Sequence, residues 1–166
     1  LANRPRLPTV QVPNVELDLP SDEAYVFVLS NVSDQHAYSL EFMLLTGLSP
    51  HEVERIEHRD LLYRTAEDAN VCPLELQIGM RDDFKTKTPA RRRSVILNRR
   101  ASNILWQCTT GTKPTHKPFP SRDATEKAIQ RMRLRHPSAP AGVERITPKM
   151  MRQWFASKIS IEVAEN

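Results

Sequence analysis

The sequence contains no apolar run of the roughly 18 residues that a membrane-spanning helix needs. Its first residues do not combine positive charge with an apolar segment, as a secretory signal does, and no lipidation motif is present. A membrane protein or an exported protein is therefore not indicated. We expect a soluble, cytoplasmic protein.

Cysteine is scarce, with only Cys72 and Cys108 in the chain. The two are far apart, and neither belongs to a Cys-x-x-Cys pair or has a His-x-x-x-His motif to complete it. This pattern argues against a disulfide framework and against a zinc site. We expect two buried free thiols, and the sequence indicates no metal and no cofactor.

Positive and negative charges are distributed unevenly along the chain. Residues 1–80 hold five Lys and Arg against 13 Asp and Glu, whereas residues 81–166 hold 19 against seven. A solvated surface explains many charge runs, but an excess of one sign repels itself unless a polyanion meets it. The basic half is therefore the predicted face for double-stranded DNA.

The length of 166 residues suits one compact domain. Residues 1–20 contain four prolines, so we expect an extended leader there and one folded domain over residues 21–166. Hydrophobic spacing and capping residues predict helices near residues 22–29, 34–45, 101–108, 124–135 and 148–159. The run Val26–Leu29, taken alone, also suits a strand.

Two short segments have the alternating pattern of strands instead. Apolar residues occupy every second position over residues 74–80, and residues 94–97 predict a returning strand after a basic turn. The predicted fold class is therefore α+β, mainly α with a small antiparallel β-sheet.

Residues 39–62 are the most informative stretch of the chain. Apolar residues at helical spacing precede Gly47, which suits the end of a helix. Ser49-Pro50-His51-Glu52 then supplies an N-cap hydroxyl, a proline at the first helical position and a glutamate for a capping box. The stretch predicts a helix, a tight turn and a second helix that runs toward Leu62.

Within this stretch, the letters LLTGLSPHEVERIEHRDL resemble the TGLR-x-x-E signature of the tyrosine recombinases, or phage integrases. In that family the Arg binds the scissile phosphate of DNA. Ser49 stands at the position of that Arg, where it can act as an N-cap, and Glu52 matches the acidic residue. Arg55 or Arg59 can in principle replace the Arg, although each would project from a different turn.

A second resemblance lies in residues 146–157, ITPKMMRQWFAS, which are similar to the family's TPH-x-LRHTFAS box. Arg152 matches the Arg of that box, and Lys149 stands at the His position, where it keeps a proton donor. A spacing of three residues puts both side chains on one helix face, near the positive end of the helix. Alternatively, they form the solvated face opposite Met151 and Trp154.

A third resemblance lies in KTKTPARRRSVIL, which is similar to the family's KTG–RR–VPL hairpin. The Lys of that hairpin acts as a general acid in the family. Lys85 is the better match and Lys87 the second, and the arginines that follow would contact DNA. These arginines are Arg91, Arg92 and Arg93. Taken alone, a surface hairpin made soluble by charge explains the segment equally well.

The resemblance covers most of residues 21–161 and implies the catalytic domain of a tyrosine recombinase. Such a domain needs no metal, forms a phosphotyrosine intermediate and works on double-stranded DNA, as a tetramer in the family. The nucleophilic Tyr of the family follows the second box, but Tyr25, Tyr38 and Tyr63 all precede it here. We therefore expect that this fragment does not itself cleave DNA.

Two functions are consistent with these patterns. The first is site-specific DNA recombination or integration by a bacterial or phage-encoded enzyme of a mobile element, with Lys85, Lys149 and Arg152 in catalytic roles. The second is a recombinase-derived accessory or regulatory protein that binds DNA without catalysis, which Ser49 favours. A basic protein–protein module is a third possibility, but it leaves the three ordered motifs unexplained.

Overall fold

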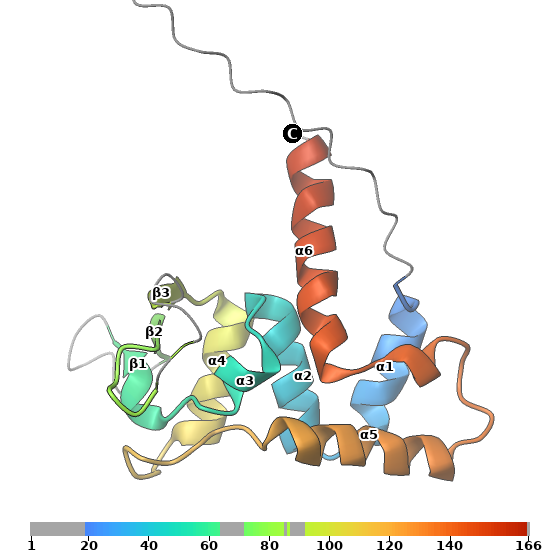
Figure 1. Ribbon diagram of the computed structural model, residues 1–166, viewed down its shortest axis with the longest axis horizontal. Coiled ribbons are helices and arrows are strands. Elements are labelled where there is room, and N and C mark those ends of the chain that lie inside the picture. Colours follow the sequence, from blue (N-terminus) through green and yellow to red (C-terminus); the bar gives the residue numbers. More distant parts are fainter. Residues whose placement is uncertain (1–18, 64–71, 85, 87–91, 166) are drawn as a thin grey trace, which may run out of the picture.

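The chain is mainly helical, with a small antiparallel sheet on one side (Figure 1). The computed structural model describes residues 19–63, 72–84, 86 and 92–165, with side chains as far as residue 157. In chain order the elements are α1 (Asp22–Asn31), α2 (Asp34–Thr46), α3 (Pro50–Val53), η1 (His58–Asp60), β1 (Leu61–Leu62), β2 (Glu75–Ile78), β3 (Arg93–Ile96), α4 (Arg99–Thr109), α5 (Arg122–Arg135), η4 (Val143–Arg145) and α6 (Pro148–Glu165).

The sheet has the strand order β1-β2-β3, and both neighbouring pairs are antiparallel. Leu76 pairs with Leu61 on one side and with Val95 on the other. Leu76 and Ile78 are buried, as the alternation predicted for β2 requires. The predicted hairpin is therefore confirmed, and β1 is an additional strand that sequence spacing did not indicate.

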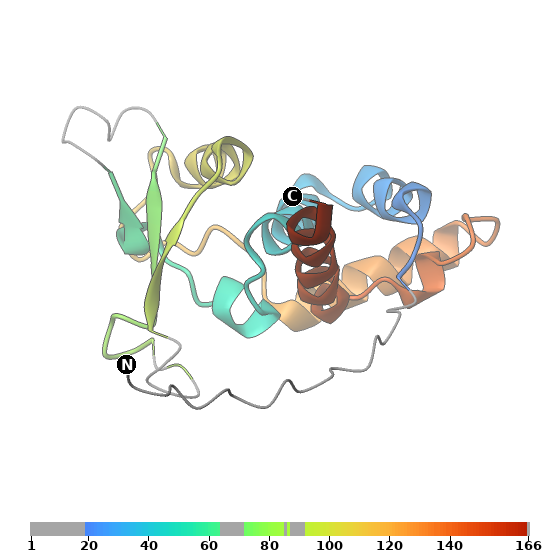
Figure 2. The same ribbon diagram turned by 90° about the horizontal axis from the view of Figure 1, so that it is seen from above.

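The core lies around α2, whose Leu40, Phe42 and Met43 are buried. Helix α6 packs mainly against α2 and projects its C-terminal half away from the rest of the molecule (Figure 1). Trp154 of α6 also meets Tyr25 of α1 edge to face, with 5.2 Å between the ring centroids. Figure 2, which looks down α6, shows this helix between the α1 side and the α3 side of the molecule.

Most of the predicted helices are confirmed, with small differences at their ends. Residues Val26–Leu29 belong to α1, so the alternative strand is wrong. Asp34 is the first residue of α2, Ser33 is its N-cap, and Gly47 ends α2 with a φ of 66°. Leu19, within the expected leader, packs against the core.

The second helix of residues 39–62 is much shorter than predicted, because α3 has only four residues. Beyond it, the backbone N–H of Glu57 donates to Asp60 Oδ2 at 2.8 Å. Arg81 then binds Glu57 at 3.2 Å and Asp60 at 2.7 Å. These distant contacts stabilise a turn, η1 and β1 in place of further helix.

Within the described part of the chain, no helix is long and apolar enough to cross a membrane. Cys72 and Cys108 are both free and half-buried, rather than fully buried as expected. The Cys72 thiol donates to Asn103 Oδ1 at 3.0 Å. Cys108 packs against the hydrophobic core.

Candidate functional site

A surface pocket of about 370 Å³ lies where the starts of three helices meet. Its lining comes from α3 and the turn before it, from α5 and from α6: Ser49, Pro50, His51, Arg122, Lys149 and Arg152. Three of these residues, Ser49, Lys149 and Arg152, are predicted site positions. The fold therefore brings together residues that are about 100 positions apart in the sequence.

The wall formed by α6 is cationic. Lys149 and Arg152 are exposed, whereas Met151 and Trp154 on the other side of the helix are buried. Among the described residues, neither Lys149 nor Arg152 forms an ion pair. The face of α6 that carries Lys149 and Arg152 is thus exposed to solvent and also lines the pocket. Both positive charges are available to an anion.

Gly47 determines how closely α6 approaches the Ser49 turn. A Cβ atom at Gly47 would overlap the ring of Phe155 in α6, and the φ of 66° is itself unfavourable for any other residue. Glycine therefore serves two needs at this position: it ends α2, and it allows the Phe155 ring to lie directly on the turn. This contact brings Arg152, one helical turn before Phe155, to the Ser49 side of the pocket.

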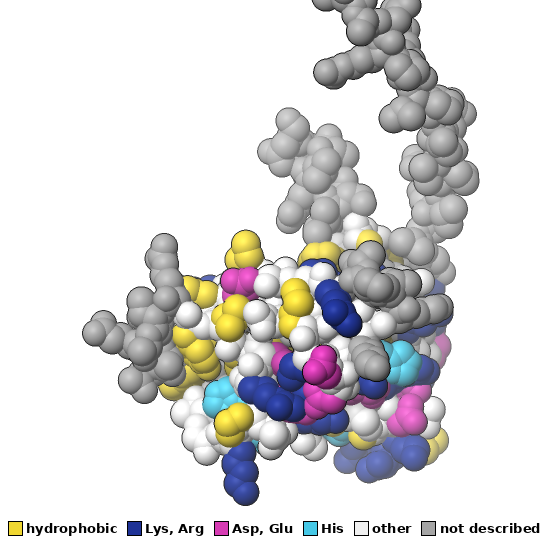
Figure 3. Space-filling view, turned by 60° about the vertical axis from the view of Figure 1, so that its left-hand side comes forward, with side chains coloured by type: hydrophobic (Ala, Val, Ile, Leu, Met, Phe, Trp, Pro, Cys, Tyr) yellow, Lys and Arg dark blue, Asp and Glu magenta, His cyan; other side chains and the backbone are white. Residues whose placement is uncertain are grey.

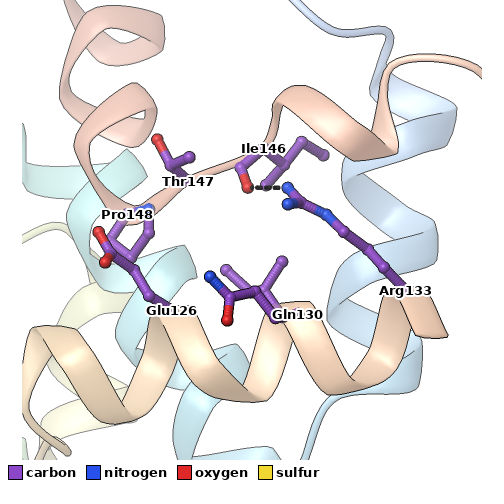
Figure 4. A pocket seen from close by; sticks show the side chains of 7 residues that line it. Glu126, Gln130, Arg133, Ile146, Thr147 and Pro148 are labelled. Atoms are coloured by element: carbon purple, nitrogen blue, oxygen red, sulfur yellow. Dashed lines mark hydrogen bonds between the residues drawn. The ribbon is translucent and has the colours of Figure 1, made fainter. Parts of the chain in front are cut away.

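Arg133 supports the segment that leads into α6. Its Nε donates to the Val143 carbonyl at 3.1 Å. Its Nη2 donates to the Ile146 carbonyl at 2.6 Å (Figure 4). Burial lowers the pKa of Arg133. The same guanidinium borders a second, smaller cavity of about 170 Å³ between α5 and the start of α6, which Glu126 and Thr147 also line. Arg133 thus stabilises the backbone that positions Lys149.

Ser49 acts as an N-cap in the structure. Its backbone N–H and its hydroxyl both donate to Glu52 Oε2, at 2.8 and 2.9 Å, and the hydroxyl accepts from the Glu52 backbone N–H. The other Glu52 oxygen accepts from Arg93 at 2.9 Å. Burial would raise the pKa of Glu52, but the hydrogen bonds from Arg93 and Ser49 outweigh it and lower the pKa. The capping box predicted for this turn is confirmed.

Arg55 and Arg59 do not replace the missing arginine at Ser49. The guanidinium of Arg55 lies 6.0 Å from the centre of the Phe84 ring, and Arg59 binds Glu57 at 2.8 Å and Asp83 at 3.0 Å. Neither residue lines the pocket. The short α3 directs both toward the sheet side.

The basic hairpin is only partly described. Lys85, Lys87 and Arg91 lie outside the described residues. Arg92 is exposed, and Arg93 in β3 forms the ion pair with the buried Glu52. The structure thus places Arg93 behind the Ser49 turn, where it supports the capping box.

Folding pairs part of the uneven charge of the sequence within the chain. Arg81 binds Asp60 at 2.7 Å, and Arg100 binds Glu41 with two bonds of 2.7 and 2.8 Å. Lys and Arg side chains accordingly lie next to Asp and Glu side chains on the face in Figure 3. Three arginines of the basic half, Arg81, Arg93 and Arg100, therefore meet acids of the first half within the folded chain. The cations of the pocket are a better guide to an anionic ligand.

Sequence reasoning missed three residues of the pocket, Pro50 and the two polar residues His51 and Arg122. His51 Nδ1 lies 3.0 Å from Glu54 Oε1, and the backbone N–H of Arg122 donates to Glu54 Oε2 at 2.9 Å. Ser121 caps α5, and a hydroxyl residue before a helix is a recognisable start signal, so Arg122 could be assigned to a helix start. No local pattern could show that this helix start meets Ser49.

Within the described residues, no group of three or more His, Cys, Asp and Glu side chains could hold a metal ion. No family model, no curated protein and no solved structure matches the chain. Its candidate function therefore depends on the pocket and on the residues that line it.

Proposed function

We propose that this chain binds double-stranded DNA with a backbone phosphate in the pocket between Ser49 and Arg152, in the manner of a tyrosine-recombinase-type catalytic domain. The observation that carries the proposal is the meeting of Ser49, Lys149 and Arg152 in one pocket. These three positions were predicted from the motifs alone. If the motifs resembled the family only by chance, the three residues would not be expected to lie in one pocket.

The chemistry of the pocket suits a phosphate. Arg152 offers a planar fork of donors that can bind two phosphate oxygens, and Lys149 adds a compact charge from the same helix face. Both side chains are exposed, so a duplex can reach them. Among the described parts of the chain no tyrosine lines the pocket, so the function that these residues support is phosphate binding.

A second candidate is a DNA-binding protein derived from a recombinase that has lost catalysis. The observation that favours it is the Ser49 hydroxyl, which is bound to Glu52 at 2.9 Å and carries no charge. A recombinase phosphate site has two guanidinium groups, and with Ser49 at this position one of the two is missing. Both candidates require that the pocket bind a DNA phosphate, so one experiment tests their shared claim.

The experiment measures binding of a labelled duplex of about 20 base pairs by fluorescence anisotropy at several salt concentrations. Arg152→Ala should weaken binding about tenfold and reduce the salt slope by about one, because one phosphate contact is lost. The matched control is Arg131→Ala. Arg131 is exposed on α5 and lies near His36, in the first turn of α2, whereas the pocket follows the other end of α2.

Thermal melts of each variant separate lost binding from lost folding. The proposal holds if Arg152→Ala and Lys149→Ala weaken binding much more than Arg131→Ala does. Equal losses in all three variants would mean that DNA responds to general positive charge, and the pocket would then have no special role.

A further inference from the structure

Arg122 is a third cation in the pocket, and the recombinase resemblance assigns it no role. It is the first residue of α5, a helix of 14 residues, and it lines the pocket together with Lys149 and Arg152. We propose that Arg122 is a DNA-binding residue of this pocket, and that Glu126 holds its guanidinium until a backbone phosphate replaces the carboxylate. This inference rests on the proposed function, because it takes a DNA phosphate as the ligand.

The backbone of Arg122 is fixed, but its side chain is held weakly. The backbone N–H donates to Glu54 Oε2 at 2.9 Å, which anchors the start of α5 beside α3. The side chain has one bond among the described residues, from Nε to Glu126 Oε1 at 3.0 Å. The Arg122 and Glu126 side chains are 40% and 32% exposed. An exposed pair at this helical spacing is easily broken, so a phosphate can compete for the guanidinium.

The bond to Glu126 uses only Nε of the guanidinium. Both Nη groups of Arg122 therefore remain available for acceptors in the pocket. A phosphate bound between Arg122 and Arg152 can then receive donors from two guanidinium forks on two different helices. Arg122 in this way supplies the second guanidinium that Ser49 does not provide.

The other arginines near Ser49 suit this role less well. Arg93 binds the buried Glu52, and its removal from that pair would leave a buried carboxylate without its cation. Arg55 and Arg59 do not line the pocket. Arg122 combines a position in the pocket with a weak ion pair.

Glu126 is placed to release the guanidinium. Besides its bond to Arg122, it lines the second cavity of about 170 Å³, whose other polar lining residues are Gln130, Arg133 and Thr147 (Figure 4). Its carboxylate thus has a polar space into which it can turn when a phosphate takes its place. In the DNA-free protein the pair keeps part of the pocket's positive charge neutralised.

The test is a double-mutant cycle of Arg122→Ala and Glu126→Gln, read as duplex affinity against salt concentration. Arg122→Ala should weaken binding about fivefold to tenfold and lower the salt slope by about one, whereas Arg131→Ala on the same helix should change little. Arg122→Lys should restore part of the affinity, because it keeps the charge and loses the fork. Thermal melts check that each variant remains folded.

Glu126→Gln gives the more specific result. It should strengthen binding by about threefold when Arg122 is present, because the guanidinium loses the one carboxylate that is hydrogen-bonded to it. In the Arg122→Ala background the gain should be clearly smaller. Equal gains in both backgrounds would overturn the proposed competition, since they would show only the removal of one negative charge.

An Arg152→Ala arm in the same series separates this inference from the proposed function. If Arg152→Ala weakens binding and Arg122→Ala behaves like Arg131→Ala, the pocket binds phosphate and the assignment of Arg122 is wrong. If Arg152→Ala and Arg122→Ala both behave like Arg131→Ala, the proposed function itself fails and the assignment of Arg122 fails with it.

Discussion

Two of the three helix starts that line the pocket, those of α3 and α6, use similar sequences in opposite ways. Each begins with a hydroxyl residue followed by proline. At the start of α3 the polar groups bind one another: Ser49 bonds with Glu52, and Glu52 is buried against Arg93. At the start of α6 the cap residue forms the internal bond: Thr147 Oγ1 accepts from the Met150 backbone N–H at 3.3 Å.

The consequence is that one start stabilises the fold while the other can bind a ligand. Lys149 and Arg152 form no ion pair among the described residues and face the pocket. Polar groups that already bond one another within a turn have few free hydrogen-bond donors for an anion. Exposed cations that are not bonded within the protein can offer all their N–H donors to it. Changes at the α3 start should therefore alter stability, and changes at the α6 start should alter DNA binding.

The largest expected effect is at Gly47, which connects the two starts. Gly47→Ala should lower the free energy of unfolding by about 3 kcal/mol, because it adds a left-handed backbone penalty to an overlap with Phe155. Chemical denaturation measures this change. Gly111→Ala is the matched control, since Gly111 has a φ of 73° but nothing lies within 4 Å of an added Cβ. A loss at Gly47 no greater than at Gly111 would show that α6 does not rest on the turn.

A smaller effect is expected at Glu52. Glu52→Gln should cost about 2 kcal/mol, because it weakens both the cap and the charged bond from Arg93. Glu41→Gln should cost less than about 1 kcal/mol, since it removes a carboxylate from the more exposed pair with Arg100. Denaturation of both variants at pH 7 tests this order of effects.

The pH dependence of the Glu52 contribution has a definite sign. The pKa of Glu52 in the folded chain lies below the ordinary value of 4.5, so its stabilising effect is fully present above that value. It is lost as the pH falls through the lowered folded pKa. The stability difference between the natural chain and Glu52→Gln should therefore shrink from pH 7 toward pH 3. A difference that grows on acidification would contradict the assigned ion pair.

A small change in stability, but an informative one, is expected for Ser49→Arg. The loss of the cap should cost about 1 kcal/mol, while the new guanidinium in the pocket should strengthen duplex binding and steepen the salt slope by about one. Ser49→Ala is the control, with the same loss of the cap and no added charge. If Ser49→Arg binds DNA no better than Ser49→Ala, position 49 does not face the phosphate.

The parts of the fold that local patterns determine could be predicted from the sequence. Helix spacing, the glycine at position 47 and the Ser49–Glu52 capping box all involve neighbours within about one helical turn. The shared face of Lys149 and Arg152 follows from the same spacing. These elements were predicted with small errors at their ends.

The parts that depend on distant contacts could not be predicted. The turn after α3 forms because Arg81 reaches back to Glu57 and Asp60, about 20 residues earlier. The ion pair of Arg100 with Glu41 joins the basic and acidic halves, which composition alone treats as separate. The place of Arg122 beside the Ser49 turn likewise follows from the packing of α5, which no short pattern encodes.

The central claim is that guanidinium groups of this pocket contact DNA phosphate, and NMR of the arginine Nε–Hε groups tests it most directly. A duplex is titrated into the labelled chain, with the signals assigned by single Arg→Lys variants. The account predicts saturable shifts for Arg152 and Arg122, and little change for Arg131 and Arg100. Shifts of similar size at all four arginines, or none at Arg152, would contradict it.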